Sequence, residues 1–187
     1  AMVTWVFLDC LLGRRPSAMG AAIGAVVGLV AITPSAGWVT VGQSFFISFV
    51  TTIVCNFAVT YKAKKHLFDD ALDVFPTHGL GGIVGTLLTG VFTYSYFFPE
   101  GGEVSRLQFF LNHVAAVAIV FGYTFVMSYA LYWVTNKMVH MRVSKRSERI
   151  GLDRSQHDEQ YGGDFAITEI AEEVPSEEEW MKSVSEN

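Results

Sequence analysis

The chain has 187 residues, of which 51% are hydrophobic and only 17% are charged, and its formal net charge is −5. Soluble globular domains carry about 25% charged residues, whereas here residues 16–61, 74–99 and 107–136 contain no Asp, Glu, Lys or Arg at all. A soluble core helix explains one such stretch but not three. The composition therefore excludes a soluble globular domain and indicates an integral membrane protein.

The first segment, residues 1–12, is apolar but too short to cross a bilayer, which needs about 20 residues of helix. The basic pair Arg14-Arg15 follows this segment, whereas a signal peptide carries its positive charge before the apolar run. The chain also begins with Ala1 rather than methionine. We therefore expect residues 1–12 to be the end of a truncated transmembrane helix, and the chain to be a fragment of a longer protein.

The three uncharged stretches predict four membrane-spanning helices within residues 17–141. The first stretch is long enough for two helices, and the turn-forming residues at 33–37 divide it. We place the four spans at about 17–36, 41–61, 72–94 and 106–137. The fold class is accordingly all-α, a polytopic transmembrane helix bundle.

Small residues predict where these spans pack together. Glycines at four-residue spacing occur in the first span at 20, 24 and 28, and in the third span at 81 and 85. Such glycines let a second helix approach closely. The two cysteines, Cys10 and Cys55, lie in separate apolar segments with no metal-ligand spacing. We expect both to be buried, and we expect no metal and no cofactor.

The positive charges predict the orientation of the spans. The loops 34–43 and 95–105 contain no Lys or Arg. Basic residues cluster instead before the first span, after the second and after the fourth, and such clusters stay on the cytoplasmic side. We therefore expect a cell-membrane protein (plasma or inner membrane) whose C-terminal tail, 142–187, is cytoplasmic. This tail is basic at its start and acidic from Asp164 onward. We expect a solvated, partly disordered extension, in which the capping-box pattern at 176–179 predicts a short helix.

One ionisable residue, His78, lies inside the third span. An ionisable side chain is costly in a bilayer and usually marks a functional site, although a structural hydrogen bond to a neighbouring helix is the alternative. Asp69, Asp70 and Asp73 precede it. We favour helix capping over a cation site for these carboxylates. Pro76 cannot donate the regular helical hydrogen bond and predicts a kink before the histidine.

These residues carry a resemblance to a known family. The stretch 68–90, FDDALDVFPTHGLGGIVGTLLTG, resembles the second half of the ammonium transporter family, which includes methylammonium permeases and Rhesus proteins. Residues 16–17 and 28–37 resemble the eighth helix of that family, and residues 142–143 and 151–161 are similar to its cytoplasmic tail motif. The resemblance covers residues 1 to about 161.

The resemblance implies the C-terminal portion of an eleven-helix ammonium transporter fold, built as an inverted repeat. Members form homotrimers with one pore in each subunit. Ammonium is deprotonated and crosses as ammonia through a hydrophobic pore that contains a pair of proton-relay histidines. By this resemblance His78 is the second of these histidines, Val74 lines the pore, Thr33 lies near the outer recruitment site, and Asp70 is a structural helix cap.

The expected function is ammonium transport and not enzymatic catalysis. The alternative is an ammonium sensor that signals through its cytoplasmic tail, and a Rhesus-type gas channel is disfavoured by the tail motif. The expected partners are ammonium or ammonia, the lipid bilayer, two further copies of the chain and a regulatory protein of the PII type on the tail, with no nucleic acid. Asp158 departs from the glycine usual in the tail motif, so the docking geometry of the tail is less securely implied than the pore.

Overall fold

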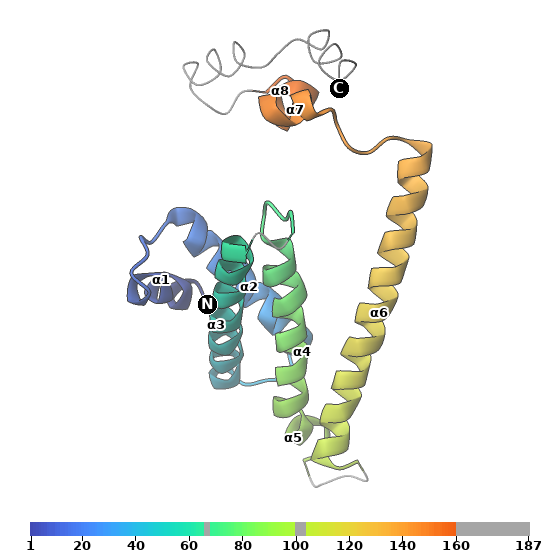
Figure 1. The fold of residues 1–187 in the computed structure, drawn as a ribbon. Helices are drawn as coiled ribbons and strands as arrows, with labels where there is room; N and C mark the ends of the chain where they lie inside the picture. The colour runs from blue at the N-terminus through green and yellow to red at the C-terminus, as the bar shows by residue number, and fades with distance from the viewer. Residues whose placement is uncertain (66–67, 100–103, 160–187) are drawn as a thin grey trace. The chain divides into compact units, whose positions relative to one another are not determined.

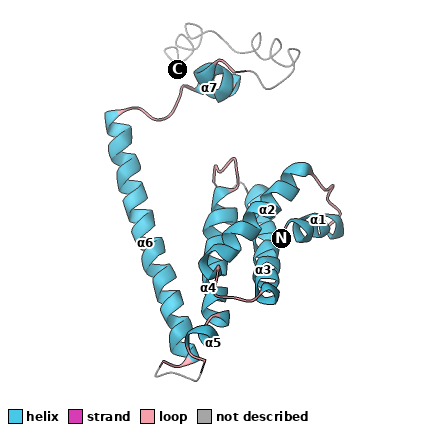
Figure 2. Ribbon diagram, turned by 180° about the vertical axis from the view of Figure 1, so that it is seen from behind, coloured by secondary structure: helices cyan, strands magenta, loops and turns pink. Residues whose placement is uncertain are grey.

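The computed structural model describes residues 1–65, 68–99 and 104–159. The described residues form helices joined by short connections, and they contain no strand (Figure 2). The all-α class is thereby confirmed. The capping-box pattern at 176–179 lies outside the described residues. The chain divides into two compact units, residues 1–124 and residues 125–187.

The first unit begins with helices that match the predicted order. They are α1 (Met2–Leu11), α2 (Ala18–Ile32), the 3-10 turn η1 (Thr33–Ser35), α3 (Val41–Lys65), the π-helix η2 (Phe75–Leu80), α4 (Gly81–Phe92) and α5 (Tyr94–Phe97) (Figure 1). Ser17 starts α2 because its hydroxyl accepts a hydrogen bond from the backbone N–H of Gly20 at 2.9 Å. Thr33 and Pro34 end this helix in a tighter turn.

Three helices among the described residues are long and apolar enough to cross a membrane. They are α2 extended by η1 (Ala18–Ser35), α3 (Val41–Lys65) and α6 (Arg106–Met138). They occupy the stretches predicted for the first, second and fourth spans. The stretch predicted for the third span, 72–94, is divided, because η2 widens the helix around Pro76 before α4 continues it. The predicted kink takes the form of this π-helical turn.

The helices α2, α3 and α4 lie side by side, and α1 packs against α2 and α3 (Figure 1). Glycines make these contacts close. A Cβ atom on Gly24 would lie 2.6 Å from the Cβ atom of Trp5, and one on Gly85 would overlap the carbonyl oxygen of Ala31. The predicted packing role of these two glycines is confirmed.

The two cysteines have different surroundings. Cys55 is fully buried between the helices, as expected, but Cys10 is exposed, and the prediction that it is buried is wrong. Trp5 and Asp9, four residues apart, form the buried face of α1. Cys10 follows Asp9 directly and is therefore turned about 100° away from that face.

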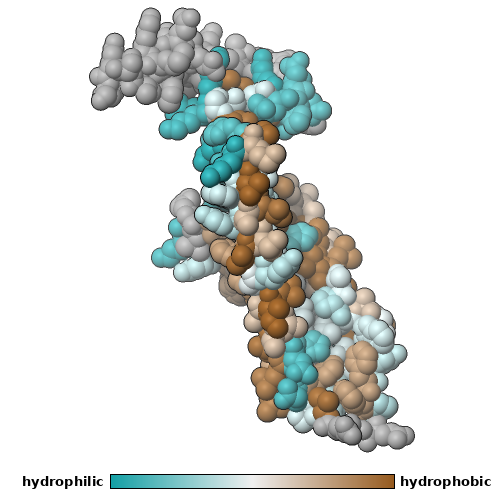
Figure 3. Space-filling view, turned by 90° about the vertical axis from the view of Figure 1, so that its right-hand side faces the viewer, coloured by the Kyte–Doolittle hydropathy of each residue, from teal (hydrophilic) through white to brown (hydrophobic). Residues whose placement is uncertain are grey.

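The helix α6 begins in the first unit, and none of its residues is buried among the described residues. Apolar side chains cover much of the surface shown in Figure 3, as expected for helices that face lipid or further helices. In the second unit, α7 (Lys145–Ile150) and α8 (Leu152–His157) meet at Gly151, whose φ is +99°. Nε of Arg142, which precedes α7, lies 2.7 Å from Oε1 of Glu148 within that helix.

Candidate functional site

The predicted site residue His78 lies in the π-helix η2, and its side chain is exposed in the first unit. Val74, four residues earlier, is 51% exposed. The two side chains therefore lie on one face of the helix, about one turn apart. Pro76 and Thr77 lie on the opposite side and are buried where η2 contacts α2 and α3. The fold thus brings His78 and Val74 together on a face that the described helices leave uncovered.

The π-helical turn is itself a notable feature of this segment. Such turns are rare and occur frequently at functional sites. Pro76 has no N–H group, so it cannot complete an ordinary α-helical ladder at this position. Thr77 supports the turn, because both its N–H and its hydroxyl donate hydrogen bonds to the carbonyl oxygen of Asp73, at 3.0 and 2.7 Å.

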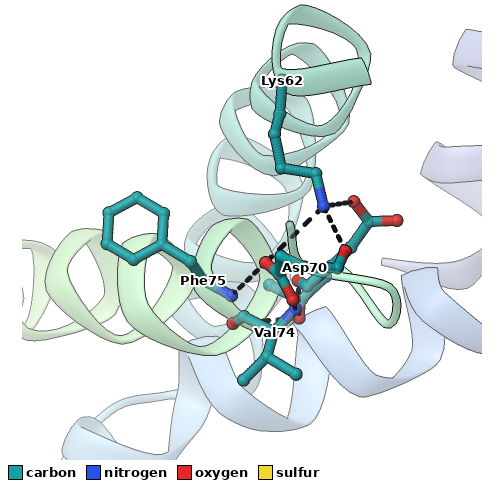
Figure 4. A network of polar contacts seen from close by, with 6 residues as sticks. Lys62, Asp70, Val74 and Phe75 are labelled. Carbon is teal, nitrogen blue, oxygen red and sulfur yellow. Dashed lines mark hydrogen bonds and ion pairs between the residues drawn. The ribbon is translucent and has the colours of Figure 1, made fainter. Parts of the chain in front are cut away.

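Asp70 holds the start of this helical segment (Figure 4). Its two carboxylate oxygens accept hydrogen bonds from the backbone N–H groups of Val74 at 2.8 Å and Phe75 at 3.0 Å. Partial burial alone would raise the pKa of Asp70. The two N–H groups and the nearby ammonium group of Lys62 outweigh this effect and hold the pKa below its ordinary value.

Lys62 is a residue at this site that the sequence analysis did not single out. Its Nζ atom lies 2.7 Å from Oδ1 of Asp73 and 3.6 Å from Oδ2 of Asp70, and it also donates to the carbonyl oxygen of Asp70 (Figure 4). The cation that pairs with the carboxylates of Asp70 and Asp73 is therefore the ammonium group of Lys62. Asp69, the third carboxylate, is exposed. The sequence signal that could have identified Lys62 is the presence of opposite charges on the two sides of the short connection, with lysines before it and aspartates after it.

Thr33 occupies a different part of the fold. It is exposed at the end of α2, and its hydroxyl donates to the carbonyl oxygen of Leu29 at 2.7 Å. The turn that it begins packs against α4. Ala31, two residues before Thr33, would be met by a Cβ atom on Gly85 of α4, which lies seven residues beyond His78 and about 10 Å further along the helix. The structure therefore separates Thr33 from the pair formed by His78 and Val74.

A second polar cluster, also missed from the sequence, joins α1 to α3. Asn56 is fully buried and donates to Oδ1 of Asp9 at 3.2 Å. Arg14 donates to Asn56 at 2.6 Å and to Thr60 at 2.5 Å, and it lies 3.4 Å from Asp9. Asp9 is the one charged residue within the apolar segment 1–12, and it was the available sequence signal for a polar partner on another helix.

His113 lies on α6 near its start. It is half-buried, its Nδ1 atom lies 3.0 Å from the carbonyl oxygen of Phe109, and its ring would meet a Cβ atom on Gly90 of α4. These contacts agree with a packing role between two helices.

Comparisons with known proteins agree on one family. The sequence model of the family described as "Ammonium Transporter Family" matches residues 1–161. The chain is 37% identical over 162 residues to a putative ammonium transporter of Methanothermobacter thermautotrophicus, covering 84% of this chain and 40% of that protein. It is 31% identical over 158 residues to an ammonium transporter of Bacillus subtilis, covering 83% and 39%.

Solved structures give the same result. The fold is similar to that of Candida albicans Mep2, with a TM-score of 0.62 and 30% identity, over 77% of this chain and 34% of that one. It is also similar to Saccharomyces cerevisiae Mep2, with a TM-score of 0.63 and 28% identity, over 80% and 37%. The chain thus spans about two fifths of the length of the curated relatives that it matches.

Proposed function

The chain belongs to the ammonium transporter family, and on this premise we propose that the full-length protein carries ammonium across a cell membrane by deprotonating it and passing ammonia through a hydrophobic pore. The observation that carries the proposal is the position of His78. It shares one uncovered face of a π-helical turn with Val74, while the opposite face of the turn is buried. An ionisable residue on such a face requires a polar or water-containing passage, because contact with lipid is costly.

Solvation energies explain why a transporter would use such a site. Moving an ammonium ion out of water without new hydrogen-bond partners costs many kcal/mol of solvation free energy. The same transfer of neutral ammonia costs far less. A passage that accepts only the deprotonated form excludes potassium, because potassium has no proton to give up. The imidazole of His78 can donate a hydrogen bond from one nitrogen and accept at the other, which suits it to relay the released proton.

The other predicted residues have supporting roles in this proposal. Val74 lines the passage one turn from His78. Asp70 caps the helix that carries both residues, and its hydrogen bonds to Val74 and Phe75 support that role. Thr33 contributes to ammonium recruitment at the outer end, where its hydroxyl oxygen remains able to accept a hydrogen bond.

Further helices of the full-length protein cover the face of His78 and bring a second pore histidine to it. The chain matches only about two fifths of the length of its relatives, and this supports the proposal of further helices. The subunits assemble as homotrimers, the tail that follows α6 is cytoplasmic, and its α7–α8 region offers a docking site for a PII-type regulator.

Electrical recording tests the proposal. The full-length protein is reconstituted in a planar lipid bilayer, and currents are recorded with ammonium, methylammonium or potassium as the added cation. We expect currents, or uptake into vesicles, with the first two cations and not with potassium. Binding of ammonium without flux would contradict transport and would identify a sensor instead.

A further inference from the structure

We infer that Lys62 is a positioning residue for the transport site: its ammonium group fixes the turn from which the π-helix bearing His78 starts. This inference rests on the proposed function, because positioning matters for transport only if His78 takes part in it. Lys62 belongs to the last turn of α3, so it ties one membrane helix to the beginning of the next.

The contacts of Lys62 differ from those of an ordinary surface lysine. Its side chain is only 11% exposed, and the carboxylates of Asp70 and Asp73 are 11% and 21% exposed. Exposed ion pairs contribute little because water and salt screen them. Here one ammonium group contacts two partly buried carboxylates and a backbone carbonyl (Figure 4). Its removal leaves both carboxylates without this cation.

Asp73 connects this cluster to the π-helix. Its φ of +54° is a conformation that L residues rarely adopt, and its N–H donates to the carbonyl oxygen of Asp70 at 3.2 Å. Its side chain binds Lys62, while its carbonyl oxygen accepts from Thr77 inside the π-helix. The ion pair with Lys62 therefore holds Asp73 in the backbone conformation that directs the chain into η2.

Packing against α2 and α3 buries Pro76 and Thr77, but few backbone hydrogen bonds hold the start of η2. Pro76 contributes no N–H group, so the first turn depends on the side-chain cap from Asp70 and on the carbonyl oxygen of Asp73. His78 follows Asp73 by five residues. A rotation of this turn moves the imidazole directly, since no flexible segment separates the two residues.

Transport kinetics test the inference in the full-length protein. Lys62→Met preserves most of the side-chain length and removes the charge, Lys62→Arg restores a cation, and Lys64→Met is the matched control, because Lys64 is exposed in the same helical turn. A misplacement of about 1 Å can cost roughly 10²-fold in a catalytic site. For Lys62→Met we expect a loss of about tenfold in methylammonium turnover per molecule in the membrane, with a nearly unchanged KM.

The expected pattern separates positioning from general stability. Lys62→Arg recovers most of the turnover and Lys64→Met retains it. A Lys62→Met protein that shows lower abundance but normal turnover per molecule would overturn the inference. If Lys62→Met does not accumulate in the membrane, Lys62→Gln provides the same comparison with a smaller change.

A second readout does not depend on flux. The imidazole signals of the full-length protein labelled with ¹⁵N-histidine are recorded by NMR in a bilayer, and the His78 signal is assigned by its loss in His78→Ala. We expect Lys62→Met, and not Lys64→Met, to shift the His78 signal. An unshifted His78 signal in Lys62→Met contradicts positioning by Lys62, whatever the transport activity of the wild type. A shifted signal together with a wild-type protein that shows no flux contradicts the proposed function alone.

Discussion

Arg14 and Asn56 are joined by a hydrogen bond of 2.6 Å from the guanidinium Nη2 to the amide Oδ1, across 42 positions in the sequence. The bond links the connection between α1 and α2 to the middle of α3. The amide Nδ2 of Asn56 in turn donates a hydrogen bond to Oδ1 of Asp9, which is 8% exposed. The short helix α1 is thus held in place by polar contacts as well as by the packing of Trp5.

Arg14→Ala should therefore destabilise the protein. The substitution removes the cation beside the nearly buried carboxylate of Asp9. It also removes the donor that binds Oδ1 of Asn56. Because Arg14 is itself partly exposed, we expect a cost of about 1–3 kcal/mol in the free energy of unfolding. Thermal unfolding of the full-length protein in detergent measures it. Arg15→Ala is the control, since Arg15 is exposed, and equal melting temperatures for the two variants would contradict this role of Arg14.

Gly85→Ala should be among the most damaging substitutions of a single methyl group. The added Cβ atom would overlap the backbone carbonyl of Ala31, and backbone cannot move aside as a flexible side chain can. We expect α2 and α4 to separate at a cost of at least about 2 kcal/mol, seen as reduced folded protein in size-exclusion chromatography. Gly122→Ala on α6 meets nothing within 4 Å, and it should be neutral or slightly stabilising. Normal yield of Gly85→Ala would show that the helices are less closely packed.

The cap made by Asp70 should give stability that depends on pH. The pKa of Asp70 is lower in the folded protein than its ordinary value, which in unfolded chains is about 3.9. Its contribution is fully present above that unfolded value, and it is lost as the pH falls through the lower folded value. The melting temperature of Asp70→Asn should therefore lie below that of the wild type at pH 7, and the difference should shrink below about pH 4. A difference independent of pH would exclude the charged cap as its source.

Sequence reasoning was most successful where composition alone decides the structure. The uncharged run that became α6 indicated a long helix, and the predicted stretch 106–137 coincides with Arg106–Met138. The family and the all-α class also followed from the sequence. The packing of Gly24 and Gly85 could be predicted because small residues at regular spacing have few other uses in a membrane helix.

The features that sequence reasoning missed depend on which way a side chain points and what it contacts in the fold. A proline predicts a disturbed helix, but the π-helical form depends on the cap from Asp70 and on packing against α2 and α3. Lys62 is one of three lysines at the end of α3, and the acidic residues that follow the connection do not by themselves show which of the three they contact. Cys10 was predicted to be buried although it lies beside Asp9, whose side chain takes the inward direction of α1.

The role of His78 as a proton relay is the central claim, and His78→Ala in the full-length protein tests it most directly. Methylammonium uptake and potassium current are measured together in vesicles of one composition, with His140→Ala, an exposed histidine that follows α6, as the control. The account predicts that His78→Ala lowers methylammonium uptake or loses the discrimination against potassium, while His140→Ala changes neither. Wild-type uptake together with wild-type exclusion of potassium in His78→Ala would contradict it.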